Sequence, residues 1–96
     1  MDFPEFLSIE ILTGDITNGV PGSASMCPIA LALGRLYPER LIEVDGCEAL
    51  LETFDPSYSS VTYLLGDAGC AFVDAFDHGD ISDEQPYTFR FMLNTA

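Results

Sequence analysis

The chain has 96 residues and a formal net charge of −13, because 16 aspartates and glutamates oppose three arginines and no lysine. This length predicts a single domain over residues 1–96, and a hydrophobic content of 48% is enough for a packed core and is not that of a disordered chain. The charge argues against direct binding to nucleic acid or to an anionic membrane, because both require basic residues, and it favours a positively charged partner.

The three cysteines, Cys27, Cys47 and Cys70, favour a reducing compartment. They are odd in number, widely spaced and set among apolar residues, whereas a secreted protein usually has paired cysteines. The first residues are acidic rather than basic, so no signal peptide is expected. No apolar run approaches the roughly 20 residues that span a bilayer. We therefore expect reduced thiols and a cytoplasmic protein.

The first third of the chain predicts a strand, a turn and a helix. Residues 6–12 alternate well enough for a strand, and residues 13–19 indicate a turn or a single helical turn. A helix then begins at Pro28, where a missing N–H costs nothing, and ends before Pro38. One apolar stripe of this helix contains Ile29, Ala32, Leu33 and Leu36.

The middle of the chain predicts short strands. Residues 41–44 form a strand that ends at the turn dipeptide Asp45-Gly46. The periodicity of residues 47–54 permits a helical turn, but the hairpin turn before them favours an extended segment. Residues 60–65 then read as a further strand.

A second helix and a last strand complete the fold. The helix is expected from about Ala68 to His78, with Asp67 as its N-cap and Gly79 as the glycine that ends it. The final strand, residues 87–93, alternates cleanly. It places Tyr87, Phe89, Phe91 and Leu93 on one face, which belongs in the core. We predict an α+β fold, with a small antiparallel or mixed sheet of four to five strands and two helices packed on one face.

Residues that could carry chemistry are few. Cys27, Cys47, Cys70 and His78 are metal-ligand types, but no pair has the close spacing of a zinc knuckle. His78 lies near the predicted end of a helix, where the helix dipole favours a histidine. We predict no metal site, no cofactor and no enzymatic activity. A small enzyme that uses Cys27 or His78 is the least favoured hypothesis.

Two acidic clusters give the stronger indication of function. If both lie on one side of the molecule, their carboxylates resemble the charges of a duplex, about one per 1.7 Å of axis. A protein with such a surface could occupy a basic groove that normally holds nucleic acid. The alternative is a solvated helix face and ordinary polar strand positions. The candidate partner-binding residues are, in the first cluster, Glu39, Glu43, Asp45, Glu48 and Glu52, and, in the second cluster, Asp74, Asp77, Asp80, Asp83 and Glu84.

Residues 11–33 carry a resemblance. Their Asp15-Ile16-Thr17-Asn18-Gly19 and Cys27-Pro28-Ile29-Ala30-Leu31-Ala32-Leu33 blocks resemble a small family of bacteriophage and prophage proteins. The segment from Phe72 to Asp77 is similar to the C-terminal half of that family, and the match covers most of the chain outside about residues 45–60. The family has no assigned activity, so the resemblance implies origin rather than chemistry.

Together these features favour a small acidic phage-type accessory protein. Such a protein would bind a basic surface of a host protein or nucleic-acid-handling complex in the host cytoplasm. An anti-defence inhibitor, anti-CRISPR or anti-restriction, that acts as a nucleic-acid mimic is one form of this hypothesis, argued by analogy from genomic context. The alternative is a homodimer that pairs apolar edge strands near Tyr87–Leu93.

Overall fold

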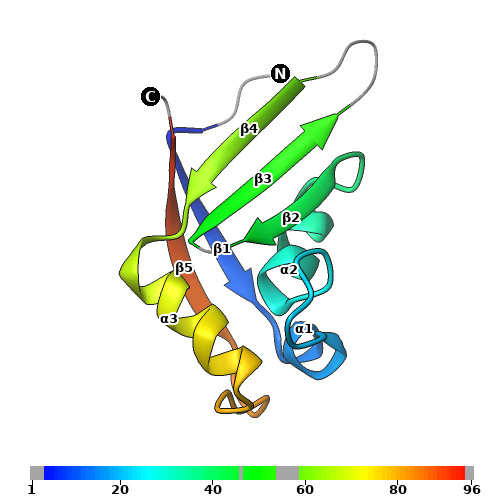
Figure 1. Cartoon of the computed structure of the whole chain (residues 1–96), viewed down its shortest axis with the longest axis vertical. Helices are drawn as coiled ribbons and strands as arrows, with labels where there is room; N and C mark the ends of the chain where they lie inside the picture. Colours follow the sequence, from blue (N-terminus) through cyan, green and yellow to red (C-terminus); the bar gives the residue numbers. More distant parts are fainter. Residues whose placement is uncertain (1–3, 46, 54–58, 95–96) are drawn as a thin grey trace.

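The computed structural model describes residues 4–45, 47–53 and 59–94, and it shows an α+β fold (Figure 1). Five strands form one antiparallel sheet with helices packed against it, so the predicted fold class is confirmed. The turn predicted before Pro28 is a third, short helix. The elements are β1 (Phe6–Ile11), α1 (Thr13–Asn18), α2 (Pro28–Leu36), β2 (Leu41–Asp45), β3 (Glu48–Thr53), β4 (Ser59–Leu64), α3 (Gly66–Asp77) and β5 (Tyr87–Leu93).

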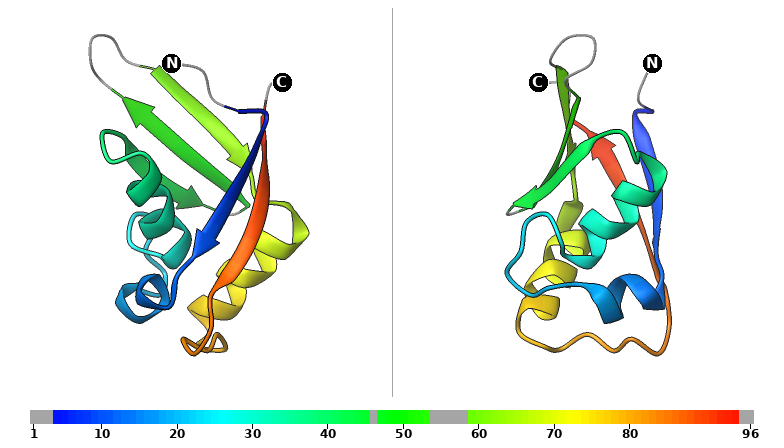
Figure 2. Two further views of the ribbon diagram at one scale, coloured as in Figure 1. Left: turned by 180° about the vertical axis from the view of Figure 1, so that it is seen from behind. Right: turned by 90° about the vertical axis from the view of Figure 1, so that its right-hand side faces the viewer.

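The strand order is β1-β5-β4-β3-β2, and it divides the sheet into two parts. β2, β3 and β4 form a meander, whereas β1 and β5 form a long pair that leaves this meander at an angle (Figure 2). In the described part of the chain, the two parts pair at Tyr63–Leu93 and Leu64–Met92. β5 is therefore an inner strand, and the expectation of an edge strand at residues 87–93 is wrong. The edges are β1 and β2.

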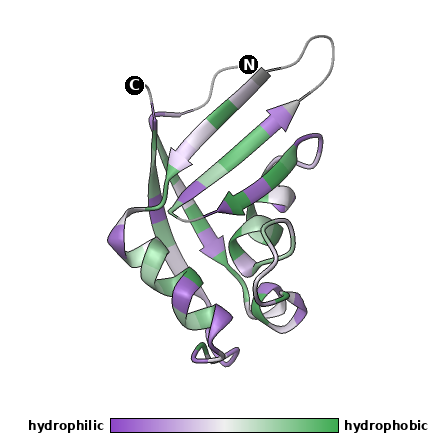
Figure 3. Cartoon of the chain, viewed as in Figure 1, coloured by the Kyte–Doolittle hydropathy of each residue, from purple (hydrophilic) through white to green (hydrophobic). Residues whose placement is uncertain are grey.

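One face of every strand is turned toward the core. Burial alternates along β1 and β2, where Leu7, Ile9 and Val44 are buried and their sequence neighbours are exposed. Hydrophobic and hydrophilic residues are interleaved along the strands (Figure 3). This alternation is the period of two that a half-buried strand requires. Among the predicted core residues of β5, Phe91 is fully buried, and three others pack against the core while partly buried: Tyr87, Phe89 and Leu93.

Helix α2 lies across the inner face and begins and ends where the sequence predicts. Pro28 occupies its first turn, and the Cys27 Sγ accepts a hydrogen bond from the Ala30 N–H at 3.5 Å. α2 packs against both β1 and β2, which are opposite edges of the sheet. The sheet therefore curves around α2, and Ile29 and Leu33 are fully buried in the concave side.

Helix α3 packs against β5. The ring of Phe72 makes edge contacts with Tyr87 and Phe89, at centroid distances of 5.2 and 5.1 Å. The prediction of Asp67 as N-cap is wrong, because the helix begins at Gly66, after Leu65, and Asp67 lies in its first turn. Gly79 has φ +78°, the left-handed conformation expected of a glycine just beyond a helix.

The ambiguous segment after β2 is extended, as favoured above. Residues 48–53 form β3, which pairs with β2 and β4 along its length. Gly46 of the predicted turn and Phe54 lie outside the described residues. No helix in the described ranges has the length and apolarity needed to cross a bilayer.

Gly69 should be irreplaceable in α3. An added Cβ would lie 2.7 Å from the Leu65 Cβ and 3.3 Å from the Phe91 Cε1, so Gly69→Ala should destabilise the fold by about 1–3 kcal/mol. Alanine is about 1 kcal/mol more favourable than glycine inside a helix, and the steric clash should outweigh this gain. Urea unfolding measures both effects. The control is Gly14→Ala in α1, where nothing lies within 4 Å of the new Cβ. A parent-like midpoint for Gly69→Ala would contradict the close packing of α3 on β5.

Candidate binding surface

Three carboxylates from the first predicted cluster share the outer face of the sheet. Glu43 and Asp45 alternate along β2, and Glu48 of β3 lies directly opposite Asp45 in the strand register. Together with Leu50 and Thr62 they line one shallow hollow on this face. Like charges directly opposite one another destabilise an antiparallel pair, so the arrangement carries a cost.

Asp45 connects these carboxylates to helix α3. A second hollow contains Asp45, Glu48 and Asp67, and it is bordered by Cys47 and Cys70. A third contains Asp45 and Asp77, with Val44 and Val73 between β2 and α3. Asp77 is therefore the member of the second predicted cluster that shares a hollow with Asp45. Asp67, which the sequence suggested only as a helix cap, joins the same surface.

Asp77 also has a structural role that the sequence did not indicate. Its Oδ1 accepts a hydrogen bond from the Gly22 N–H at 2.9 Å, which ties α3 to the loop before α2. Gly22 has φ +78°, so this loop needs a glycine at that position. The same loop covers the outer edge of β2, because the Val44 N–H donates to the Ala24 carbonyl at 2.8 Å.

The remaining predicted acids do not gather at this surface. Asp83 accepts a hydrogen bond from the Thr17 Oγ1 at 3.0 Å and so lies beside α1. Glu84 accepts one from the Ser82 hydroxyl at 3.3 Å. Glu52 is paired in register with Leu41, toward the opposite end of β3 from Glu48. The other acids outside the group around Asp45 are Glu39, just before β2, Asp80, just beyond α3, and Asp74, on the exposed side of α3.

Among the residues that the structure describes, no ion pair involves Glu43, Asp45 or Glu48. In residues 4–45, 47–53 and 59–94 the recorded ion pairs are Arg35–Asp15 and His78–Asp74. The His78 Nδ1 donates to the Asp74 carbonyl oxygen at 2.7 Å, and this bond, with the nearby Asp74 carboxylate, raises the pKa of His78. The helix-end position expected for His78 is confirmed.

The cysteines differ from the expectation. Cys47 and Cys70 form a disulfide with a Cα–Cα distance of 5.0 Å, so the prediction of three reduced thiols is wrong. The bond joins residues 23 positions apart, and nothing in their spacing or apolar surroundings indicates pairing. It links the start of β3 to α3 beside Asp45 and Asp67. Cys27 is the free cysteine, and it is buried.

Burial raises the pKa of the Cys27 thiol above its ordinary value. A catalytic nucleophile requires the opposite shift, since the thiolate is the reactive form. Within the described part of the chain no hydrogen bond joins Cys27 to His78, which is exposed. In the same residues, no group of three or more cysteines, histidines or carboxylates could hold a metal ion.

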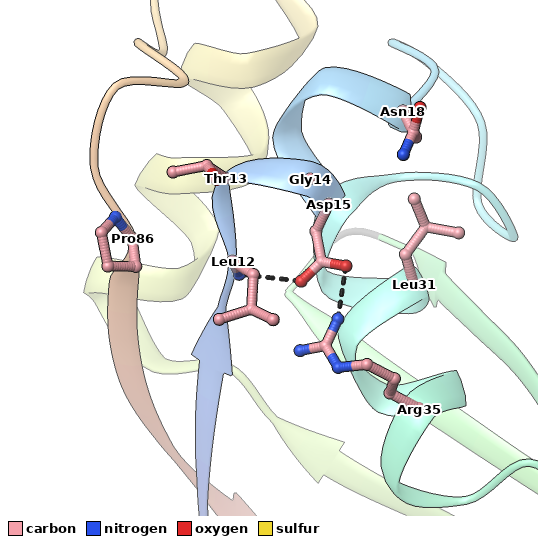
Figure 4. A pocket seen from close by; sticks show the side chains of 8 residues that line it. All are labelled: Leu12, Thr13, Gly14, Asp15, Asn18, Leu31, Arg35 and Pro86. Carbon is pink, nitrogen blue, oxygen red and sulfur yellow. Dashed lines mark hydrogen bonds and ion pairs between the residues drawn. The ribbon is translucent and has the colours of Figure 1, made fainter.

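A separate pocket lies beside the Asp15–Arg35 ion pair (Figure 4). The Asp15 Oδ2 accepts the Leu12 N–H at 2.8 Å, and its Oδ1 accepts the Arg35 Nη1 at 2.5 Å. Arg35 also donates to the Glu10 carbonyl at 3.0 Å. Both carboxylate oxygens of Asp15 are thus committed to holding α1, α2 and β1 together. This pair is structural.

No protein-family model, curated protein or solved structure matches this chain. The resemblance of residues 11–33 to phage proteins therefore stays a prediction. The function has to be argued from the geometry around Asp45.

Neutralising one member of the opposed pair should stabilise the protein. Asp45→Asn removes the repulsion from Glu48 and should raise the free energy of unfolding by about 0.2–1 kcal/mol at low ionic strength. The gain should shrink in salt, which screens exposed charges. Urea unfolding is suitable because urea is uncharged. The control, Glu10→Gln, removes the same charge opposite Thr88 and should give no such gain. An unchanged or lower stability for Asp45→Asn would contradict the repulsion.

The cysteine assignment predicts a thiol count. Folded protein should react slowly with an alkylating reagent, because Cys27 is buried and the other two cysteines are bonded. Denatured protein should expose one thiol without reductant and three after reduction, as counted by mass spectrometry. Three thiols before reduction would show that Cys47 and Cys70 are not paired.

Proposed function

We propose that this protein acts by stoichiometric binding of a basic surface on a partner protein, through the carboxylates gathered around Asp45. The observation that carries this proposal is the opposed pair Asp45–Glu48 with Glu43 beside it, none of which has an ion-pair partner in the described part of the chain. The fold retains a local repulsion that a positively charged partner would relieve. Residues retained at a cost to stability are typical of sites under functional constraint.

The net charge of −13 supports the same proposal at longer range. A strongly acidic protein is steered toward a basic surface before contact, which raises the association rate at low salt. The specific carboxylates then determine where the partner docks. Neither step requires a catalytic group or a cofactor.

The partner that we propose is a host protein or complex that normally holds nucleic acid in a basic groove. The resemblance of residues 11–33 to phage proteins favours a host defence complex, a CRISPR effector or a restriction enzyme, and the protein would then act as an anti-defence nucleic-acid mimic. Such complexes lie in the host cytoplasm, where exposed disulfides are usually reduced. Binding should therefore survive reduction of Cys47–Cys70.

The test compares two variants of equal net charge. The site variant carries Glu43→Gln, Asp45→Asn and Glu48→Gln, and the control carries Glu39→Gln, Asp80→Asn and Glu84→Gln. Tagged parent protein should capture a basic nucleic-acid-handling complex from host lysate at low salt and release it at high salt. The control should capture the same complex, whereas the site variant should bind it about tenfold more weakly or not at all.

Equal capture by both variants would contradict the role of the Asp45 carboxylates. A partner that both variants lose would indicate that only total charge matters. Circular dichroism of each variant confirms that loss of binding is not loss of fold.

A further inference from the structure

We propose that the outer face of the sheet binds a basic amphipathic helix of the partner, and that an apolar row on this face contributes to the affinity together with the carboxylates. This inference rests on the proposed function and specifies the partner's chemistry. Its basis is the strand register, which places residues from five separate segments in one line across the sheet: Phe6, Met92, Leu64, Glu48 and Asp45.

The row has two chemically different halves. Phe6 and Met92 are exposed to 46% and 45%, and Leu64 is half-buried beside them. Glu48 and Asp45 complete the row on the other side. Phe6, Met92 and Glu48 occupy the strand positions that alternate with buried residues, so they belong to the face away from α2 and α3.

The dimensions of the row suit a helix. Neighbouring strands are about 4.7–4.9 Å apart, so the four steps from Phe6 to Asp45 measure about 19 Å along the curved sheet, which is an upper bound for the straight length of the row. A helix rises about 1.5 Å per residue, so about 13 residues, or between three and four turns, would cover this length. The next row of the meander adds Leu50 between Glu43 and Thr62, so a further apolar side chain lies beside the carboxylates.

The charges on the row select the orientation of that helix. The Arg90 guanidinium lies 4.2 Å from the centroid of the Phe6 ring, so the apolar end also carries a positive charge. The opposite end carries Glu48 and Asp45. A helix with its N-terminus over Asp45 and its C-terminus near Arg90 would complement both ends through its dipole. Lysine or arginine side chains near its N-terminal turns would meet the carboxylates.

A second copy of this chain is a poor occupant of the face. If two copies stacked with their rows parallel, Asp45 and Glu48 would face the same carboxylates in the partner copy. If the rows ran in opposite directions, these carboxylates would be buried against Phe6 and Met92. Both arrangements are unfavourable, the first through repulsion and the second through desolvation. A partner with its own basic residues avoids both.

The test uses two defined probes and three variants. The first probe is a synthetic amphipathic helix of leucine and lysine, and the second is poly-L-lysine, which offers charge alone. Phe6→Thr/Met92→Thr removes the apolar half of the row with residues suited to strands. Its control is Val20→Thr/Met26→Thr. Both of these side chains are exposed to 45%, and they lie in the loop between α1 and α2, outside the row. The third variant, Asp45→Asn/Glu48→Gln, removes the acidic half.

The apolar variant should bind the helix about tenfold more weakly and bind poly-L-lysine unchanged, as measured by fluorescence anisotropy. The loop control should match the parent, and the acidic variant should weaken both probes. A scrambled peptide of the same composition should bind at least tenfold more weakly than the helix. Amide chemical-shift changes on adding the helix should map to the outer residues of β2 to β5.

Three outcomes would overturn this inference. They are equal binding of the helix and its scrambled form, an apolar variant that binds the helix like the parent, and a dimer in sedimentation experiments that the apolar variant abolishes. The proposed function fails separately. If the acidic variant binds both probes as the parent does, the basic-partner proposal is wrong. If only the apolar variant is without effect, that proposal stands and the helix assignment does not.

Discussion

The short junction between β4 and β5 is the constraint on which the rest of this structure depends. Tyr63–Leu93 and Leu64–Met92 join the β1–β5 pair to the β2–β3–β4 meander. Tyr63 is fully buried at this point, its hydroxyl donates to the Pro4 carbonyl at 2.6 Å, and burial raises the pKa of that hydroxyl to about 12. The backbone reinforces the junction, because the Asn94 N–H donates to the Thr62 carbonyl. This junction makes the two parts one continuous sheet with a common outer face, and α2 packs against both parts on the inner side.

The local patterns in the sequence predicted the elements because strands and helices depend on near neighbours. The alternation in residues 6–12 and 87–93 gave β1 and β5, and Pro28 gave the start of α2. The start of α3 was misplaced because Asp67 has the residue type of a cap but lies inside the first turn. A preference for a residue type at a cap is weak, and the helix begins one residue earlier, at Gly66, whose φ of +75° is a conformation that favours glycine.

The features that could not be predicted are those that depend on pairing between distant segments. Asp15 meets Arg35 across 20 positions, and Cys47 meets Cys70 across 23. Pairing between residues this far apart along the chain produces no periodic pattern in the sequence. The sequence also grouped the acids by position along the chain, whereas the fold separates Asp83 from Asp77 and brings Asp77 to the hollow that contains Asp45. The acidic residues could be identified from the sequence, but only the strand register shows which of them lie together on one surface.

The disulfide explains how the fold can retain a repulsive surface at the end of β2 and β3. A cross-link that closes a loop of this length contributes about 2–4 kcal/mol, mainly by restricting the unfolded chain. The repulsion between Asp45 and Glu48 costs about 0.2–1 kcal/mol, which is less than the stabilisation that the disulfide provides. Reduction removes the covalent tie but leaves the hydrogen bond from the Leu65 N–H to the Cys47 carbonyl at 2.8 Å, and the contacts of Phe72 with β5. The carboxylates would then be held by strand pairing and packing without the covalent tie, and the relief of repulsion by a basic partner would contribute a larger share of the stability of this corner.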